Sequence, residues 1–383
     1  MGQFIHIVFY LGAIQGIMLS VFLFSLKVNK TANRLLALLT LFLSAILFQF
    51  ALQVQGYYTF YSHPYKTLSI LVFTLGPLHY LYVKYLLYDL KKFDKRDLWH
   101  FAPVVFYIAI SFEFYFLNAP EKAEWIANRT LFYRIVDVIA DEFAVVQGIT
   151  YSILILFRLD DYKKEVANYE SNIDQMILRA LFKGVLLIAL AWVIAAIDIN
   201  LDYFGLISGN DLLIYTFLLI VLAIYYTSYV AIYSPEIFKI EATKLRVVFL
   251  RRKKTDVIFK SDDDKNKAQL ETFDQALTTI IENDKPYLKF NLNLAELAEM
   301  VNLTRNQLSF VINQKHRMNF NEYINSYRVE EVKRLMLNPA NKHLKLISLA
   351  YDAGFNSKAS FNRIFKKLTD MTPSQYFTMQ KAG

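Results

Sequence analysis

Long apolar segments separated by short polar ones make up the first two-thirds of the chain. A helix needs about 20 residues to cross a bilayer, and stretches such as 14–26 and 212–225 lack the polar stripe of a soluble helix. The missing stripes disfavour the alternative of buried helices in a large soluble protein. The pattern predicts seven membrane-spanning helices: Phe4–Leu26, Leu35–Val54, Leu68–Tyr88, Leu98–Leu117, Ile135–Phe157, Leu181–Leu201 and Leu212–Tyr233.

From Leu270 onward the pattern becomes amphipathic with a period near 3.6, and no β-type alternation is visible. This part contains an internal repeat, with one copy at residues 294–312 and the other at 347–365. Each copy indicates a short helix, a tight turn and a second helix, which is the helix-turn-helix arrangement. We therefore predict an all-α protein with a membrane domain at 1–234, a linker at 235–270 and a C-terminal domain at 271–383.

The positive charge is unevenly placed. The net charge is +8, yet residues 1–238 are close to neutral, so the excess lies in the linker and the C-terminal domain. The cluster Arg251-Arg252-Lys253-Lys254 follows the last predicted span closely. Its position favours attraction to anionic lipid, at about 1 kcal/mol per basic residue, over the alternative of contact with the DNA backbone. The chain has no cysteine, which excludes disulfides, thiolate nucleophiles and cysteine zinc sites.

Loop charges predict the orientation of the membrane domain. The connections that alternate with the predicted spans carry twelve Lys and Arg on one side and three on the other. The basic side faces the cytoplasm by the positive-inside rule. The N-terminus is then outside and, after seven crossings, the C-terminal domain is in the cytoplasm. We therefore expect a multi-pass protein of the inner (cytoplasmic) membrane.

Two groups of residues in the predicted spans call for an interpretation. Gly12 and Gly16 form a small-residue face on the first span, which suits close packing within the chain or, alternatively, a homodimer. Ionisable residues near the outer ends of the fifth and sixth spans either cap these helices at the wet interface or form a pocket that senses a ligand, ion or pH. These candidate sensing residues are Arg134, Asp137, Asp141, Asp198 and Asp202.

Local signals define both turns of the C-terminal repeat. Gly354 supplies a positive φ angle for one turn, and Asn302 is the best substitute for glycine in the other. Thr304 and Gln307 predict a capping box at the start of one second helix, and Ser357 predicts a cap for the other.

Helix geometry at 100° per residue then separates the faces of these two second helices. One face is apolar and predicts the core, with Leu308, Val311 and Ile312 in the first helix and Phe361, Ile364, Phe365 and Leu368 in the second. The opposite faces carry side chains that can bond base edges in the major groove or hold phosphates. The predicted DNA-binding residues are Arg305, Asn306, Gln307, Ser309, Phe310, Asn313, Lys358, Asn362, Arg363 and Lys366.

The C-terminal domain resembles the DNA-binding domain of the AraC/XylS family. The resemblance rests on Phe320-x-x-Tyr323-Ile324-x-x-Tyr327-Arg328-Val329, Gly354-Phe355-x-Ser357, Phe361-x-Arg363-x-Phe365-Lys366-Lys367 and Thr372-Pro373-Ser374-x-Tyr376. It implies seven helices, in which a long central helix at about Phe320–Leu337 joins two helix-turn-helix units. It also implies that the base-reading positions fall on Asn306, Ser309, Phe310, Asn362 and Arg363. The complete fold expected is therefore a seven-helix transmembrane bundle followed by a seven-helix double helix-turn-helix domain.

The chain also departs from that family. Asn302 stands where a turn glycine is usual, and Phe310, Ile312 and Asn313 replace residues common in the family, so the first unit is less basic. Most family members have a soluble ligand-binding domain instead of spans. The motifs Gly76-Pro77-Leu78-x-Tyr80 and His100-Phe101-x-Pro103 resemble a bacterial subgroup with membrane-integrated N-termini.

These features favour a membrane-integrated transcription regulator that binds double-stranded DNA and responds to an unidentified signal. RNA polymerase is a further candidate partner. No catalytic motif, metal-ligand spacing or glycine-rich phosphate loop is visible, so we expect no enzyme activity, no metal and no cofactor. Two alternatives stay open: a transporter or intramembrane enzyme with a regulatory DNA-binding tail, and a receptor whose tail binds protein.

Overall fold

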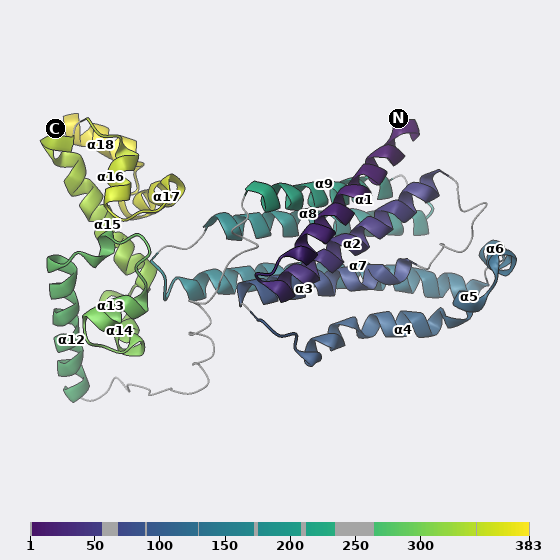
Figure 1. The fold of residues 1–383 in the computed structure, drawn as a ribbon, viewed down its shortest axis with the longest axis horizontal. Helices are drawn as coiled ribbons and strands as arrows, with labels where there is room; N and C mark the ends of the chain where they lie inside the picture. Colours follow the sequence, from purple (N-terminus) through teal and green to yellow (C-terminus); the bar gives the residue numbers. More distant parts are fainter. Residues whose placement is uncertain are drawn as a thin grey trace. The chain divides into compact units, whose positions relative to one another are not determined.

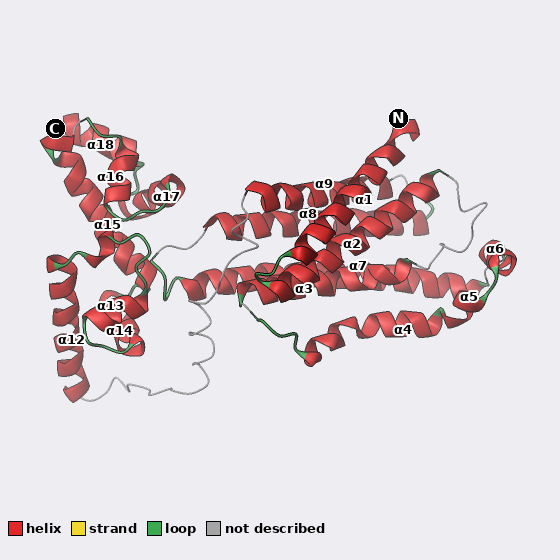
Figure 2. Cartoon of the chain, viewed as in Figure 1, coloured by secondary structure: helices red, strands yellow, loops and turns green. Residues whose placement is uncertain are grey.

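The computed structural model describes residues 2–55, 68–88, 90–128, 130–171, 175–207, 212–233, 264–341 and 343–382. Within these ranges the regular structure is helical (Figure 2). The nearest approach to a sheet among the described residues is an isolated antiparallel bridge between Glu170 and Asn293. The prediction of an all-α protein is confirmed.

The chain forms two compact units, and each is described by itself (Figure 1). The first unit comprises Met1–Leu159 and Ile177–Arg251, and the second comprises Asp160–Met176 and Arg252–Gly383. The second unit therefore contains the short connection between two helices of the first unit in addition to the C-terminal helices.

The first unit consists of helices that are mostly apolar. Its elements are α1 (Gly2–Ser25), α2 (Lys30–Val54), η2 (Ser69–Leu71), α3 (Val72–Leu87), η3 (Lys95–Phe101), α4 (Ala102–Ile110), α5 (Phe112–Phe116), α6 (Ala119–Ala127), α7 (Leu131–Val166), α8 (Gln175–Tyr203) and α9 (Leu213–Tyr233). Helix α1 packs on α2 and α9, and α2 packs on α3.

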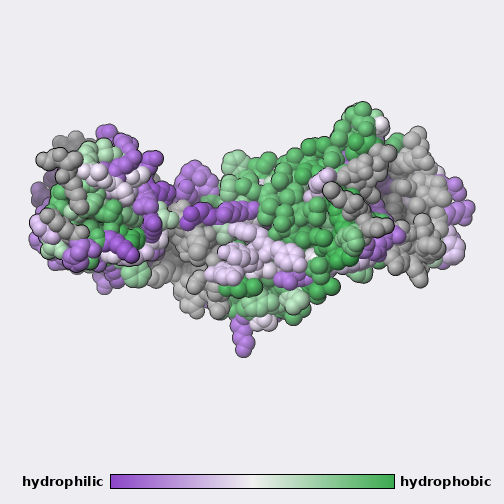
Figure 3. Space-filling model, turned by 90° about the horizontal axis from the view of Figure 1, so that it is seen from above, coloured by the Kyte–Doolittle hydropathy of each residue, from purple (hydrophilic) through white to green (hydrophobic). Residues whose placement is uncertain are grey.

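Six helices in the described part of the first unit are long and apolar enough to cross a membrane. They coincide with six of the seven predicted spans, at Phe4–Ser25, Lys30–Val54, Ser69–Leu87, Ile135–Val166, Leu178–Tyr203 and Leu213–Tyr233. Many of their large apolar side chains face outward, as on α1, where Phe4, Met18 and Val21 are each more than 60% exposed. Figure 3 shows the resulting apolar surface over the first unit. Large exposed apolar patches mark contact surfaces for protein or membrane, so this surface is compatible with a position in lipid.

The fourth predicted span, Leu98–Leu117, differs from the others. It is helical, but it is divided among η3, α4 and α5, with a break at Ser111 between the last two. Ser111 lies between two helices instead of within one because its backbone leaves the helical region of φ and ψ. No single helix here reaches spanning length, so the expectation of one continuous helix is corrected.

The small-residue face of α1 packs within the chain. A Cβ atom added at Gly12 would lie 2.7 Å from Val221 of α9. At Gly16 the added atom would overlap the Ser44 hydroxyl of α2 and lie 3.2 Å from Ile224 of α9. Glycine at both positions thus allows α1, α2 and α9 to approach closely, as expected for small residues in membrane bundles.

The second unit holds two helical subdomains joined by one long helix. Its elements are α12 (Asp264–Asn283), η4 (Pro286–Leu288), α13 (Leu294–Met300), α14 (Arg305–Val311), η5 (Ile312–His316), α15 (Phe320–Leu337), η6 (Pro339–Asn341), α16 (Leu346–Asp352), α17 (Lys358–Thr369) and α18 (Pro373–Ala382). The start of α15 contributes Phe320 and Ile324 to one apolar core, and its second half contributes Val329 and Val332 to the other. The predicted central helix has the predicted bounds.

Candidate nucleic-acid interface

The first helix-turn-helix consists of α13 and α14. Asn302 in the turn between them has a φ angle of 54°, in the left-handed region that asparagine tolerates better than most residues. Thr304 and Gln307 form the predicted capping box at the start of α14, since each side chain accepts a bond from the backbone N–H of the other residue. The buried face of α14 and η5 is the predicted one, with Leu308, Val311 and Ile312 fully buried.

The second helix-turn-helix consists of α16 and α17. Gly354 has a φ angle of 90° in the turn, and the Ser357 hydroxyl accepts a hydrogen bond from the Ser360 backbone N–H at the start of α17. Phe361, Ile364 and Phe365 are buried as predicted. Leu368 is 41% exposed, so its assignment to the core was wrong. It lies at the edge of the apolar face in the last turn of α17.

The outward face of α17 is polar and basic along its length. Lys358, Asn362, Arg363 and Lys366 are all exposed on it. Because α17 begins at a capped N-terminus and is 12 residues long, it presents this face over about three turns, which is enough to enter a major groove. Asparagine and arginine at its centre can bond adenine and guanine edges, and lysines near its ends can hold phosphates.

The outward face of α14 is shorter and less charged. Asn306 and Asn313 are exposed, whereas Arg305, Gln307, Ser309 and Phe310 are half-buried. The helix runs directly into η5, a single π-helical turn, and the Asn313 amide donates to the Ser309 carbonyl oxygen at 2.8 Å. Lys315 at the edge of this face is paired with Glu271 of α12. The first recognition face therefore relies on amide, hydroxyl and apolar groups more than on charge.

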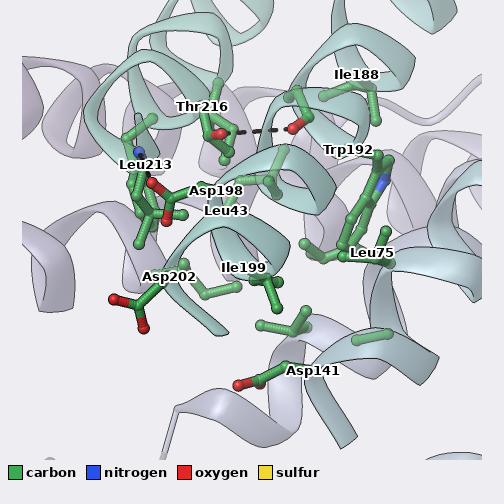
Figure 4. A pocket seen from close by; sticks show the side chains of 18 of the residues that line it. Leu43, Leu75, Asp141, Ile188, Trp192, Asp198, Ile199, Asp202, Leu213 and Thr216 are labelled. Carbon is green, nitrogen blue, oxygen red and sulfur yellow. Dashed lines mark hydrogen bonds between the residues drawn. The ribbon is translucent and has the colours of Figure 1, made fainter. Parts of the chain in front are cut away.

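A separate cluster lies in the first unit. Three of the candidate sensing residues, Asp141 of α7 and Asp198 and Asp202 of α8, line one cavity of about 500 Å³ (Figure 4). Asp137 is half-buried on α7 and does not line the cavity. Arg134 belongs to α7, but its side chain is outside the described residues.

Sequence reasoning did not assign two other lining residues to this cavity. They are His79 of α3 and Trp192 of α8. No spacing pattern along the chain groups either residue with the aspartates.

The basic cluster Arg251–Lys254, expected to meet anionic lipid, is outside the described residues. Across the described part of the chain no group of His, Asp and Glu residues is arranged to hold a metal ion.

Comparison with known proteins identifies the class of the C-terminal domain. Residues 297–379 match the helix-turn-helix domain family and form a domain of the AraC type. This range includes both turns, α14, α15 and α17. The resemblance predicted from the sequence motifs is confirmed for this domain.

Several relatives share that domain. The chain is 34% identical over 86 residues to an uncharacterized HTH-type transcriptional regulator of Staphylococcus aureus (strain COL), covering 22% of this chain and 11% of the relative. It is 32% identical over 85 residues to the uncharacterized HTH-type transcriptional regulator YijO of Escherichia coli (strain K12), covering 22% and 29%. The chain thus spans about a tenth to less than a third of the length of these relatives. No solved structure matches it.

Proposed function

We propose that this protein is a membrane-integrated transcription regulator whose C-terminal domain binds specific sites on double-stranded DNA. One observation carries the proposal: two capped helices, α14 and α17, present polar outward faces and are held in one domain by α15. A pair of such helices can occupy two successive turns of the major groove. The related HTH-type transcriptional regulators support the same function.

In this proposal the recognition residues have two roles. Asn306, Ser309 and Phe310 of α14, with Asn362 and Arg363 of α17, read base edges. The other predicted DNA-binding residues position the domain on the phosphate backbone. They are Arg305, Gln307, Asn313, Lys358 and Lys366.

The membrane placement is supported by the six long apolar helices and their exposed apolar side chains. We propose the orientation with the N-terminus outside and the DNA-binding domain in the cytoplasm, because it agrees with the loop charges and delivers the domain to the chromosome. This orientation requires an odd number of crossings, so η3, α4 and α5 together form the seventh crossing in this proposal. Sensing by the membrane unit, contact of Arg251–Lys254 with anionic lipid, homodimerisation and recruitment of RNA polymerase belong to the same proposal.

The test is DNA binding by the intact chain in lipid nanodiscs, measured on duplex genomic fragments over a range of salt concentrations. We expect binding whose logarithmic affinity falls linearly with the logarithm of salt concentration, because bound phosphates release their counterions. The matched variant Arg363→Ala should bind more weakly and with less sequence preference. Failure of the wild-type chain to bind any fragment at low salt would favour a protein-binding tail instead.

A further inference from the structure

The five residues after α7, Ala167–Ser171, are built into the C-terminal domain, and we call them the strap. Three backbone hydrogen bonds hold it. The Asn321 N–H donates to the Ala167 carbonyl (2.8 Å), and the Leu294 N–H donates to the Tyr169 carbonyl (2.9 Å). The Ser171 N–H donates to the Leu292 carbonyl (3.2 Å). The Tyr169 side chain also packs on the apolar core of the first subdomain.

Side chains of α15 extend this attachment. The Asn321 amide donates to the Ser171 carbonyl at 2.7 Å, and the Asn325 amide donates to the same oxygen at 3.1 Å. Ser171 is fully buried, and its hydroxyl donates to the Leu292 carbonyl at 2.6 Å. A buried polar group is retained only where it has partners, so this network is specific for the strap.

The strap completes the binding site of Arg328, the largest fully buried side chain of the domain. The guanidinium donates to the carbonyls of Tyr287 (2.7 Å) and Lys289 (2.8 Å) and to the Ser171 hydroxyl (3.1 Å). Burial lowers the pKa of this group to about 9, which expresses the cost of taking its charge out of water. Every acceptor around it therefore matters, and the strap supplies two of them, the hydroxyl and the carbonyl oxygen of Ser171 (3.1 and 3.4 Å).

Arg328 lies where the two helix-turn-helix units meet. It projects from α15 and bonds the segment before α13, which belongs to the first unit. On its other side, a Cβ atom added at Gly354 in the second turn would lie 3.0 Å from the Arg328 Nε atom. The strap thus contacts the joint between the two helix-turn-helix units.

We propose that the strap, and not only the linker after α9, transmits the state of the membrane helices to the two recognition helices. Helix α7 has residues on the cavity of the first unit at Val138, Asp141, Ala144 and Val145, and it ends at Val166, directly before the strap. A shift of α7 would move the strap and would change its contacts with Arg328 at the joint between the two helix-turn-helix units. This inference rests on the proposed function for its DNA readout, but strap docking is testable separately.

The first experiment tests docking in the full chain in native membranes. Glu170 and Asn293 form a bridge pair flanked by the hydrogen bonds above, a geometry with a Cα separation of about 4.5 Å that lies within the range for a disulfide. Because the chain has no cysteine, Glu170→Cys with Asn293→Cys provides the only two thiols. Mild oxidation should protect both thiols from a maleimide reagent, whereas each single variant stays reactive. Full reactivity of the double variant would overturn docking.

The second experiment tests transmission. Ser171→Ala, alone and with Asn321→Ala, should weaken binding of the full chain in nanodiscs to a genomic fragment by roughly tenfold, while the helix content stays unchanged. The matched control is Asp160→Ala with Lys164→Ala, which removes an exposed ion pair at the end of α7 that does not touch Arg328. Unchanged affinity of the Ser171 variants would overturn transmission. Loss of binding in the wild type would instead overturn the proposed function and leave the thiol result standing.

A different observation concerns the cavity in the first unit. Its volume of about 500 Å³ is within the range of sites for drug-sized molecules, about 300–1,000 Å³. Its walls are mainly apolar, with Trp192, Phe217 and Ile188 among the lining residues. The charged groups among the described lining residues are the carboxylates of Asp141, Asp198 and Asp202, and none is a lysine or arginine.

The three carboxylates differ in their exposure and in their partners. Asp198 is 5% exposed and accepts the backbone N–H groups of Leu212 (3.0 Å) and Leu213 (3.2 Å), so it fixes the start of α9. Asp141 and Asp202 lie on the exposed side. His79 is 9% exposed and also lines the cavity.

We infer that this cavity binds an organic cation with an apolar body, held between the carboxylates and the apolar wall. The probe is tritiated tetraphenylphosphonium, measured on the full chain in nanodiscs, and its control is tetraphenylborate, which has the same shape and the opposite charge. We expect saturable binding of the cation only. Asp141→Asn with Asp202→Asn should weaken it roughly tenfold, whereas Asp137→Asn, on the same helix but outside the cavity, should not. Equal binding of both ions, or binding that the double variant leaves intact, would overturn the inference.

Discussion

The two helix-turn-helix units repeat one motif, but they use their turns differently. The turn at Asn302 needs only a residue that tolerates a left-handed backbone. The turn at Gly354 needs glycine for a second reason, because an added Cβ atom would lie 2.4 Å from the Tyr287 carbonyl oxygen and 2.8 Å from that of Leu288. The second turn is thus packed against the first subdomain at the joint around Arg328. The difference teaches that a glycine in this motif can report a tertiary contact as well as a φ angle.

The two recognition helices, α14 and α17, also differ, in their regularity and in their charge. Helix α17 is regular and carries exposed basic residues, whereas α14 is short, continues into a π-helical turn and has its nearby Lys315 paired with Glu271. We therefore expect the second helix-turn-helix, with α17, to supply most of the charge-based affinity for DNA. The first helix-turn-helix, with α14, should supply a sequence preference based on amide and apolar contacts.

The largest expected effect comes from the two turns. Gly354→Ala should destabilise the second subdomain by about 3 kcal/mol or more, since it combines backbone strain with overlap of a carbonyl oxygen. Asn302→Ala should cost only about 1 kcal/mol, because it affects the φ preference alone. Hydrogen exchange of α15–α18 and of α13–α14 in the full chain measures both. Equal losses at the two turns would contradict the distinction drawn between them.

The next effect concerns base recognition. Arg363→Ala should weaken binding to a selected site by about 1–3 kcal/mol and relax the preference at one base pair. Asn306→Ala should lower affinity less, because its face carries less charge. Titration of each variant against the selected duplex and a set of single-base changes provides the comparison. A larger loss of affinity for Asn306→Ala than for Arg363→Ala would contradict the larger contribution assigned to the second helix-turn-helix.

A smaller effect should appear in the salt dependence. Lys366→Ala removes an exposed charge from α17, so the slope of log affinity against log salt should decrease by about 0.9. Lys315→Ala should change that slope much less, since Glu271 already neutralises this lysine. The two slopes, measured on one duplex, check whether the phosphate contacts belong mainly to the second helix-turn-helix. Equal changes would place both lysines on phosphates.

The smallest expected effect is on the pH dependence of stability, and it comes from an ion pair that joins α17 to α15. Lys367 of α17 donates to the Glu322 carboxylate of α15 at 2.8 Å, and this bond lowers the pKa of Glu322 below its ordinary value of 4.5. The ion pair therefore stabilises the fold above about pH 4.5 and loses its contribution as the pH falls through the lowered value. Glu322→Gln should flatten the pH dependence of unfolding between pH 5 and 3, measured by circular dichroism. An unaltered profile would exclude this link.

Much of the second unit could be predicted from its sequence because local signals agreed with each other. The capping box at Thr304 and Gln307 and the bounds of α15 are set by residues within a few positions of each other. Leu368 was assigned wrongly because a helical wheel shows which face is apolar but not where a neighbouring element ends. The break at Ser111 escaped prediction since hydropathy measures the length of an apolar run and not the continuity of its helix.

The strap could not be predicted at all. Ala167–Ser171 reads as an ordinary connection between two spans, and Ser171 is more than 150 positions from Arg328 along the chain. Nothing in the composition of either segment indicates the pairing, which exists only because the fold closes around a buried guanidinium. The cavity was half-predicted: the sequence analysis grouped Asp141, Asp198 and Asp202 as candidate sensing residues, but only the fold adds His79 and Trp192 to them and leaves Asp137 outside.

The most direct measurement is cross-linking of the full-length protein to chromosomal DNA in living cells, followed by isolation of the membrane fraction and sequencing of the bound fragments. We predict a shared motif with two half-sites about one helical turn, 10 base pairs, apart, and a weaker motif in cells that carry Arg363→Ala. A membrane fraction without any enriched sequence, or the same sequences at the same enrichment with that variant, would contradict DNA recognition by these paired helices.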